Sequence, residues 1–196
     1  MKILPSERLR EDVQALFQSL GQLPPPVEKP VFIALSGLPG TGKTYFSQKL
    51  TEVYPAVILE SDALRKVLFP RPTYSWRESA RLFRACYLLI EELLRRGIPL
   101  VLDATNLIER YRRKLYAIAR KAGVKLILVK LQAPPEVVRK RLEAREKDPR
   151  NRSDAGWEVY LMMRPREEKI RRRHFVVDTT QDVQPAIKKI LREIKK

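Results

Sequence analysis

The stretch that decides the fold is LSGLPGTGKTYF, residues 35–46. Residues 37–44 fit the pattern G-x-x-x-x-G-K-[ST] at every position, after an apolar run and before a helical one. Glycines let successive backbone N–H groups point at phosphate oxygens, and the following helix adds its positive N-terminal end. A glycine-rich turn without a ligand is the alternative, and the complete match disfavours it. The loop is therefore predicted to bind ATP or GTP, through Gly37, Gly40, Thr41, Gly42, Lys43 and Thr44.

Short apolar runs alternate with helical patterns along the chain. Strands are expected at residues 31–35, 56–59, 99–103, 124–131 and 174–179. Helices are expected at residues 42–52, 61–69, 76–96, 107–122, 135–147, 157–172 and 185–195. Parallel strands need crossover connections of this kind, which are usually helical. The pattern predicts an α/β domain with a five-stranded parallel sheet flanked by helices.

Two segments precede this domain. The sequence SERLREDVQALFQSL (residues 6–20) repeats apolar residues at helical spacing, which predicts an amphipathic helix within residues 1–22. The sequence LPPPVEKP (23–30) cannot form a helix or a central strand and is expected to be a stiff linker. Residues 31–196 then form the main domain, and a length of 196 residues suits one such domain.

An acidic and a basic residue follow the second predicted strand, in the sequence LESDALRK. Open α/β sheets place their ligands at the carboxyl ends of the strands, so Asp62 and Arg65 are expected at the site. There Asp62 is suited to take a proton from an attacking hydroxyl, and Arg65 to hold a neighbouring phosphate. The alternative is that Ser61 and Asp62 only cap a helix.

A second carboxylate, Asp103, ends the third predicted strand in the sequence VLDATNL. This position next to the phosphate-binding loop suits a residue that orients the shell of a Mg²⁺ ion, together with the Thr44 hydroxyl, or one that positions the acceptor. Lys43 is expected to reach the β- and γ-phosphates. Alternatively, Asn106 and Glu109 form a capping pair for the next helix and Asp103 only braces the turn.

Residues 146–157 are predicted to form a lid over the site. The sequence DPRNRSDAG (148–156) interrupts the helical pattern with Pro, Asn, Ser, Asp and Gly. Arg145, Arg150 and Arg152 flank or occupy it, and an arginine placed over the γ-phosphate stabilises transition-state charge. A solvated run of charges is the alternative, and spacing does not select one arginine.

The positive charge of the chain is regional. Residues 110–173 contain 21 Lys and Arg against 8 Asp and Glu, a surplus of 13 in a chain whose net charge is +17. A face that binds polyanions is favoured over a heat-adapted surface. Because the N-terminus lacks an apolar signal segment, no run is long enough to span a membrane, and Cys86 is the only cysteine, we expect a cytoplasmic protein without a disulfide framework.

The motifs GLPGTGKT, SDALR and DATNL together resemble the polynucleotide 5′-hydroxyl kinase family, which is related to small kinases of the zeta-toxin and gluconate type. The resemblance covers about residues 31–180 and implies a P-loop kinase fold with an Arg-bearing lid. It also implies that Asp62 is the general base toward a 5′-OH and that Arg65 holds the phosphate on the 3′ side. One of Arg145, Arg150 and Arg152 would contact ATP.

The sequence thus predicts an ATP- and Mg²⁺-dependent transfer of the γ-phosphate to a 5′-hydroxyl end of RNA or DNA. Related kinases of sugars and antibiotics share the same skeleton, so a small-molecule acceptor (a sugar, a nucleoside or an antibiotic) stays open. A nucleic-acid-binding module that binds ATP without phosphorylating an acceptor is a third hypothesis, in which Asp62 and Arg65 would have no task.

Overall fold

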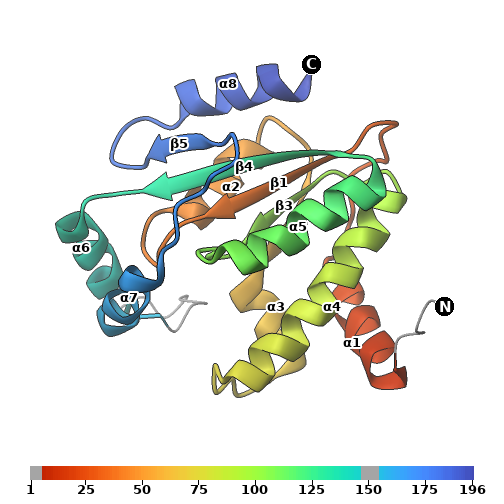
Figure 1. Cartoon of the computed structure of the whole chain (residues 1–196), viewed down its shortest axis with the longest axis horizontal. Helices are drawn as coiled ribbons and strands as arrows, with labels where there is room; N and C mark the ends of the chain where they lie inside the picture. Colours follow the sequence, from red (N-terminus) through yellow and green to blue (C-terminus); the bar gives the residue numbers. More distant parts are fainter. Residues whose placement is uncertain (1–5, 147–154) are drawn as a thin grey trace.

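Five parallel strands form one sheet at the centre of the molecule (Figure 1). The structure is a computed structural model that describes residues 6–146 and 155–196. The strands lie in the order β2-β3-β1-β4-β5. They are β1 (Val31–Ser36), β2 (Val57–Glu60), β3 (Leu100–Asp103), β4 (Lys125–Gln132) and β5 (Phe175–Asp178). The α/β class and the five-stranded parallel sheet are thereby confirmed.

Strand β1 is central because neither of its faces meets water. All six of its residues are buried, and Ile33 lies opposite Val101 of β3 on one side and Ile127 of β4 on the other. Successive side chains of a strand point to opposite faces. Phe32 and Ala34 accordingly join one apolar core and Ile33 joins the other.

Helices cover both faces of the sheet (Figure 1). The Phe32 face packs against α1 (Glu7–Gln18), α3 (Ser61–Leu68), α4 (Trp76–Arg95) and α5 (Glu109–Ala122). The Ile33 face packs against α2 (Lys43–Thr51) and α8 (Gln184–Ile194). A smaller core forms beyond the carboxyl end of the sheet, where α6 (Pro135–Glu146) and α7 (Trp157–Met163) meet the phosphate-binding loop around the buried Leu38. Among the described residues, none of the helices has both the length and the apolar character that crossing a membrane requires.

The N-terminal helix packs on the domain. Leu16 of α1 is fully buried in the core shared with α4, and Asp12 is also buried. Arg81 of α4 binds the Asp12 carboxylate through two hydrogen bonds, from Nε to Oδ2 at 2.8 Å and from Nη2 to Oδ1 at 2.6 Å. Helix α1 therefore braces α4, and it also contacts α3.

One predicted helix is wrong in its length. The helix expected over residues 157–172 ends at Met163 and is followed by a single 3-10 turn, η1 (Arg164–Arg166). Pro165 explains the end, because its ring nitrogen has no hydrogen to donate and its ring obstructs further α-helix. Glu167 is already extended, with φ −71° and ψ 114°. Residues 167–174 thus run as an irregular segment toward β5.

The carboxyl ends of β1 and β3 meet at the point where the connections leave the sheet in opposite directions. The chain goes from β1 outward to β2 and returns through β3, whereas the connection after β3 leads to β4 on the other side. Ligands of open α/β sheets bind in the crevice at such a point. In this molecule, that crevice holds the phosphate-binding loop and Asp103.

Candidate active site

The phosphate-binding loop joins β1 to α2 and depends on its glycines. A Cβ on Gly37 would lie 2.5 Å from the Leu131 carbonyl oxygen and 2.7 Å from the Thr41 hydroxyl, so no side chain fits there. Gly42 precedes the first residue of α2 with φ 84°, a left-handed conformation that glycine adopts without strain. The Thr41 hydroxyl closes the turn by donating to the Leu38 carbonyl at 2.8 Å. The loop therefore presents the start of α2 to the cavity.

Lys43 and Thr44, the first residues of α2, meet Asp103 at the end of β3. The Thr44 hydroxyl donates to Asp103 Oδ2 at 2.7 Å, and Lys43 Nζ donates to the Leu38 carbonyl at 3.0 Å. Burial raises the pKa of the Asp103 carboxyl, while the Lys43 charge and the Thr44 hydrogen bond oppose the rise. Burial likewise lowers the pKa of the Lys43 ammonium, against the charges of Asp103 and Asp62. The Lys43 ammonium and the Asp103 carboxyl are thus both buried next to the phosphate-binding loop.

Asn106 holds the turn after β3. It does not cap α5, which the sequence had offered as an alternative role for this residue. The Asn106 side-chain amide donates to the Leu35 carbonyl of β1 at 2.7 Å, and its backbone has φ 44°. Gly37 N–H donates in turn to the Thr105 carbonyl at 3.0 Å. The N-cap position of α5 belongs to Ile108. These bonds fix the Asp103 turn against the phosphate-binding loop.

Asp62 and Arg65 lie on α3 and line the same cavity as Lys43. Helix α3 begins at Ser61, so Asp62 is in its first turn, and no side chain caps it by a hydrogen bond. Arg65 is buried, at 6% exposure. One of its terminal nitrogens donates to Ser79 Oγ at 3.2 Å, and the other lies 3.7 Å from a Glu78 carboxylate oxygen. Helix α3 thus brings Asp62 and Arg65 to the cavity.

Arg145, at the end of α6, also lines this cavity and donates from Nη2 to the Ala155 carbonyl. Arg150 and Arg152, and with them most of the predicted lid over residues 146–157, lie outside the described residues. That one of these three arginines contacts the γ-phosphate therefore remains a prediction.

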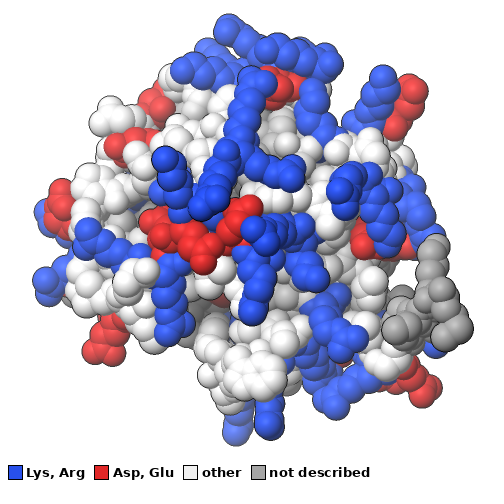
Figure 2. All heavy atoms as spheres, viewed as in Figure 1, with Lys and Arg blue, Asp and Glu red and all other residues white. Residues whose placement is uncertain are grey.

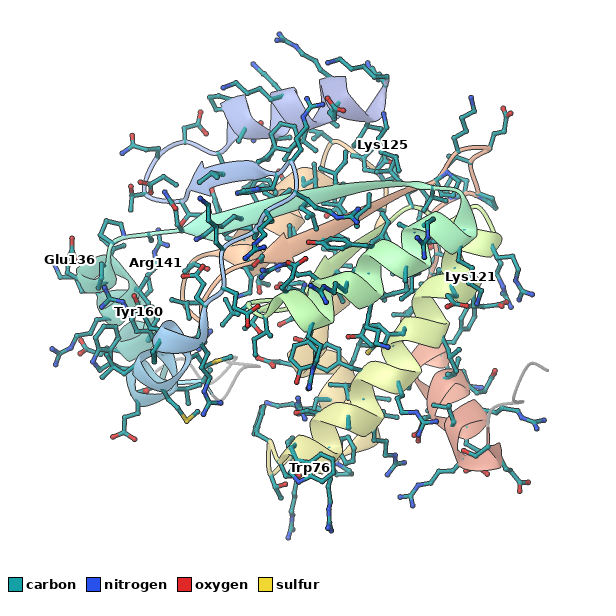
Figure 3. The ribbon with its side chains drawn as sticks, in the orientation of Figure 1. Trp76, Lys121, Lys125, Glu136, Arg141 and Tyr160 are labelled. Atoms are coloured by element: carbon teal, nitrogen blue, oxygen red, sulfur yellow. The ribbon has the colours of Figure 1, made fainter. Side chains whose placement is uncertain are left out.

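Arg141 is a site residue that our sequence reasoning missed (Figure 3). It lines the cavity one helical turn before Arg145. Its guanidinium donates to Thr179 Oγ1 and to the Thr179 carbonyl, both at 2.8 Å, and Thr179 Oγ1 donates to the Thr41 carbonyl at 2.9 Å. Arg141 thereby connects α6 and the turn after β5 to the phosphate-binding loop. Its spacing of four from Arg145, on one face of α6, was the signal in the sequence.

The cavity that these residues line has a volume of about 890 Å³. It extends from the phosphate-binding loop past Asp62 and Arg65 to α4, α5 and α7. On the side away from the loop its wall carries aromatic and cationic side chains, namely Tyr74, Trp76, Phe83, Tyr87, Arg110, Tyr111 and Arg166. This volume lies within the range of small-molecule sites, which hold a few polar groups in mostly apolar walls.

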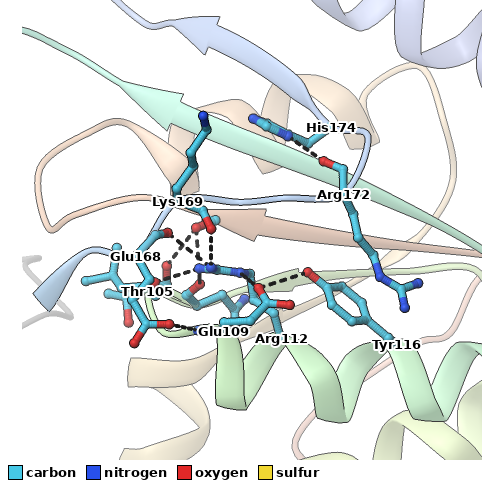
Figure 4. Close-up of polar contacts among 11 residues, drawn as sticks. Thr105, Glu109, Arg112, Tyr116, Glu168, Lys169, Arg172 and His174 are labelled. Atoms are coloured by element: carbon cyan, nitrogen blue, oxygen red, sulfur yellow. Dashed lines mark hydrogen bonds and ion pairs between the residues drawn. The ribbon is translucent and has the colours of Figure 1, made fainter.

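A second missed residue, Arg112, holds the far wall of the cavity together (Figure 4). It is fully buried on α5. Its Nε donates to Glu109 at 2.9 Å. The terminal nitrogens donate to the carbonyls of Asn106 and Leu107 at 2.9 and 2.6 Å, and to those of Glu168 and Lys169 at 3.0 and 3.2 Å. Arg112 thus joins the turn after β3 to the irregular segment after η1.

Glu168 strengthens the same junction. Its carboxylate accepts from Glu109 N–H at 2.7 Å, and its own N–H donates to the Leu107 carbonyl at 3.0 Å. The position of Arg166, two residues before Glu168, is thereby coupled to the turn that carries Asp103.

The fold is similar to that of several solved structures, two of which are named as kinases. APS kinase CysC from Mycobacterium tuberculosis, in complex with AMPPNP and APS, has a TM-score of 0.66 at 15% identity, over 88% of this chain and 100% of that one. Kti12 from Chaetomium thermophilum, in complex with ADP-AlF3, has a TM-score of 0.65 at 22% identity, over 83% and 98%. A gluconokinase from Sinorhizobium meliloti 1021 has a TM-score of 0.60 at 21% identity, over 85% and 92%. At these identities the likeness concerns the fold.

A family model matches the sequence itself over residues 32–170, which is more than half of the chain. The matched range contains the phosphate-binding loop, the Asp62 and Arg65 pair on α3 and the Asp103 turn after β3. With its loop, its sheet order and this match in agreement, the chain belongs to the AAA domain family.

Proposed function

We propose that this protein is a kinase that transfers the γ-phosphate of ATP, with Mg²⁺, to a hydroxyl group of an anionic acceptor. One observation carries the proposal. The cavity that begins at Lys43 of the phosphate-binding loop continues to a carboxylate, Asp62, and a buried guanidinium, Arg65, on another element. A protein that only bound or hydrolysed a nucleotide would not need a carboxylate and a guanidinium from a second element, α3, in the same cavity.

The residues around Thr44 fit a magnesium ion. Mg²⁺ is commonly held in proteins by one or two carboxylates, together with waters and substrate phosphates. The Thr44 hydroxyl and the Asp103 carboxylate, 2.7 Å apart at the start of α2, provide oxygen ligands of this kind next to the phosphate-binding loop. When bound, the ion would neutralise charge on the β- and γ-phosphates.

The chain's own residues would divide the remaining work. Asp62 accepts the proton of the acceptor hydroxyl as its oxygen forms a bond to the γ-phosphorus and the bond from that phosphorus to the β–γ bridging oxygen breaks. Lys43 stabilises the charge that develops on the β- and γ-phosphates. Arg145 lies on the lid side, where a second cation serves the same charge. Arg150 and Arg152 are kept as the other candidates for this role.

Arg65 indicates what the acceptor carries. Within the described part of the chain, its Nε and Nη1 atoms are buried and have no hydrogen-bond partner. The 3.7 Å separation of Nη1 from Glu78 is too long for a hydrogen bond. Buried charged donors are costly unless they are satisfied, so a ligand anion is the expected partner. A phosphate or carboxylate next to the acceptor hydroxyl would meet both Arg65 and Asp62.

Two acceptor classes fit this description. The first is a small anionic molecule, such as a sugar acid or a nucleotide. It has the better support because the volume of the cavity suits a small ligand and the similar structures include a gluconokinase and an APS kinase. The second is the 5′-hydroxyl end of RNA or DNA, whose first phosphate would lie at Arg65. The exposed Trp76 on the rim of the cavity favours this second class, because bases stack on such rings.

The test is transfer of label from γ-labelled ATP to a matched panel of acceptors. The panel contains sugar acids, nucleosides, nucleoside 3′-phosphates and short 5′-OH and 5′-phosphate oligonucleotides. Asp62→Asn should lower kcat/KM by about 10²- to 10⁴-fold. ATP affinity should stay close to that of the parent protein. Exposed Glu52→Gln removes a carboxylate outside the site and serves as the control.

Each result has a clear meaning. Label on nucleoside 3′-phosphates but not on nucleosides supports the anion at Arg65. Equal use of both contradicts it. Unchanged turnover of Asp62→Asn overturns the assignment of the base, and bound ATP without transfer to any acceptor favours a binding module instead.

A further inference from the structure

Helix α5 carries a row of exposed cations on one face. Arg110, Arg113, Lys114 and Arg120 follow one another at intervals of three, one and six residues, which places them along one side of the helix. All four side chains are exposed. At about 1.5 Å per residue, the row from Arg110 to Arg120 is roughly 15 Å long.

Two further arginines extend this row. Arg172 stacks on the ring of Tyr116, with its guanidinium carbon 4.1 Å from the ring centroid, so the segment after η1 lies against α5. Arg171 precedes it and is also exposed. Figure 2 shows Lys and Arg side chains over α5 and over this segment, with a group of Asp and Glu side chains between them near the start of α5. We refer to the set as the α5 basic surface: Arg110, Arg113, Lys114, Arg120, Arg171 and Arg172.

The α5 basic surface is not neutralised from within. Among residues 6–146 and 155–196, none of its six cations forms an ion pair with a carboxylate. Three acids lie nearby, and two of them pair with cations outside the set: Glu109 accepts from the buried Arg112, and Glu167 pairs with Lys130 at 2.9 Å. Glu168 accepts from a backbone N–H and keeps its charge. Such an uncompensated row attracts a polyanion, whose bound counterions are released on contact.

The row begins at the active-site cavity. Arg110 and Tyr111 both line the cavity, and Tyr111 is 43% exposed. Trp76 lies on another part of the same rim and is 75% exposed (Figure 3). A line of cations that starts beside one exposed aromatic ring, with a second ring on the wall of the same cavity, matches single-stranded nucleic acid, whose phosphates follow the charges while its bases stack on rings.

We propose that the α5 basic surface binds single-stranded nucleic acid, with the strand running along α5 away from the cavity. The proposal goes beyond the transfer reaction, since it concerns binding and requires neither ATP nor a hydroxyl end. An anionic lipid surface would meet the same charges, so binding to anionic vesicles is one arm of the test.

The experiment measures fluorescence anisotropy of a labelled 12-nucleotide RNA and the matching DNA, without ATP, between 50 and about 300 mM salt. The test variant is the triple change Arg113→Gln, Lys114→Gln and Arg120→Gln, which leaves Arg110 at the cavity unchanged. The matched control is Lys188→Gln, Lys189→Gln and Arg192→Gln on α8. These three residues are exposed, and their substitution removes the same amount of charge on the opposite face of the sheet.

The α5 variant should bind either strand about 100-fold more weakly at 0.1 M salt, and the slope of log K against log salt should fall by about 2, because three phosphate contacts are lost. The α8 control should bind as the parent protein does. An equal loss in both variants, or binding to anionic vesicles but to neither strand, overturns the proposal.

A further comparison separates this proposal from the proposed function. Asp62→Asn should retain full strand binding while losing transfer. If the parent protein binds the strands but transfers no phosphate, only the proposed kinase function is refuted. A kinase that binds no strand refutes only the α5 basic surface. Unchanged ATP affinity in the α5 variant shows that its fold is intact.

Discussion

Arg112 offers the sharpest test of how the active site is held. Replacing it with methionine (Arg112→Met) keeps an unbranched side chain in a fully buried position but removes the guanidinium and its five hydrogen bonds. The carbonyls of Asn106 and Leu107 keep a second donor each, from Ser36 Oγ and from Glu168 N–H. In the described residues, the carbonyls of Glu168 and Lys169 have no other donor, and they lose their only partner.

The size of the effect follows from these lost partners. Glu168 and Lys169 are exposed, so water can replace the guanidinium at their carbonyls, and the net loss is that of two hydrogen bonds from a charged donor. At about 1.5–3 kcal/mol each, the two bonds together contribute about 3–6 kcal/mol. The buried apolar surface of methionine returns about 1–2 kcal/mol. We expect the free energy of unfolding to fall by about 3 kcal/mol, which a typical stability of about 5–15 kcal/mol tolerates.

Urea unfolding followed by circular dichroism measures this loss. With an m-value of about 2–3 kcal/mol per molar, the midpoint should fall by about 1–1.5 M. The neighbouring exposed residue provides the control, since Arg113→Met should change the stability by less than about 0.5 kcal/mol. In the folded Arg112→Met variant, the KM for the acceptor should also rise, because only the hydrogen bonds of Glu168 still join the turn after β3 to the segment that follows Arg166. Equal midpoints for the two variants would refute this account of the junction.

Three other changes test the loop, the carboxylate and the N-terminal helix. Asp103→Asn should stabilise the unliganded protein above about pH 4, because burial raises the pKa of Asp103 in the fold and its ionisation therefore favours the unfolded chain. This gain should grow as the pH rises through the raised pKa and vanish below about pH 4, so a difference in unfolding midpoints that does not change with pH would contradict it. Gly37→Ala should lower the free energy of unfolding by about 1–3 kcal/mol and weaken ATP binding, since its Cβ would meet the Leu131 carbonyl at 2.5 Å. An ATP affinity that calorimetry finds unchanged would contradict this expectation. Asp12→Asn removes the ion pair with Arg81 and should lower the free energy of unfolding by about 2 kcal/mol. Limited proteolysis after α1 should then be faster, whereas an unchanged cleavage rate would show that the pair does not hold the helix.

Local patterns in the sequence predicted the sheet and the phosphate-binding loop well, for a physical reason. A buried strand must be apolar and a phosphate-binding turn must contain glycines, so both leave a contiguous signature at residues 31–44. The placement of Asp62 and Asp103 at the cavity followed from the rule that sites form at the carboxyl ends of strands. Their chemical roles are still proposals.

Other features were missed because they depend on segments far apart in the chain. Arg112 stands in the run RYRRK and looks like one surface charge among several, while its partners include residues 168 and 169. A signal was nevertheless present, since Arg112 shares a helical face with the buried Leu115, Tyr116 and Ala119. The end of α7 at Met163 had an equally simple sign in Pro165.

The packing of α1 and α8 has a practical consequence for how this protein is produced. The family match covers residues 32–170, whereas α1, β5 and α8 lie outside that range. A fragment cut at those limits would turn β4 into an edge strand. It would also uncover apolar residues of α4 and α3, on which α1 packs, and those of the other core, which α8 covers with Ile187. Exposed apolar faces and unpaired strand edges promote aggregation. Expression trials should therefore keep residues 6–196 together, because the cooperative unit is larger than the recognisable motif region.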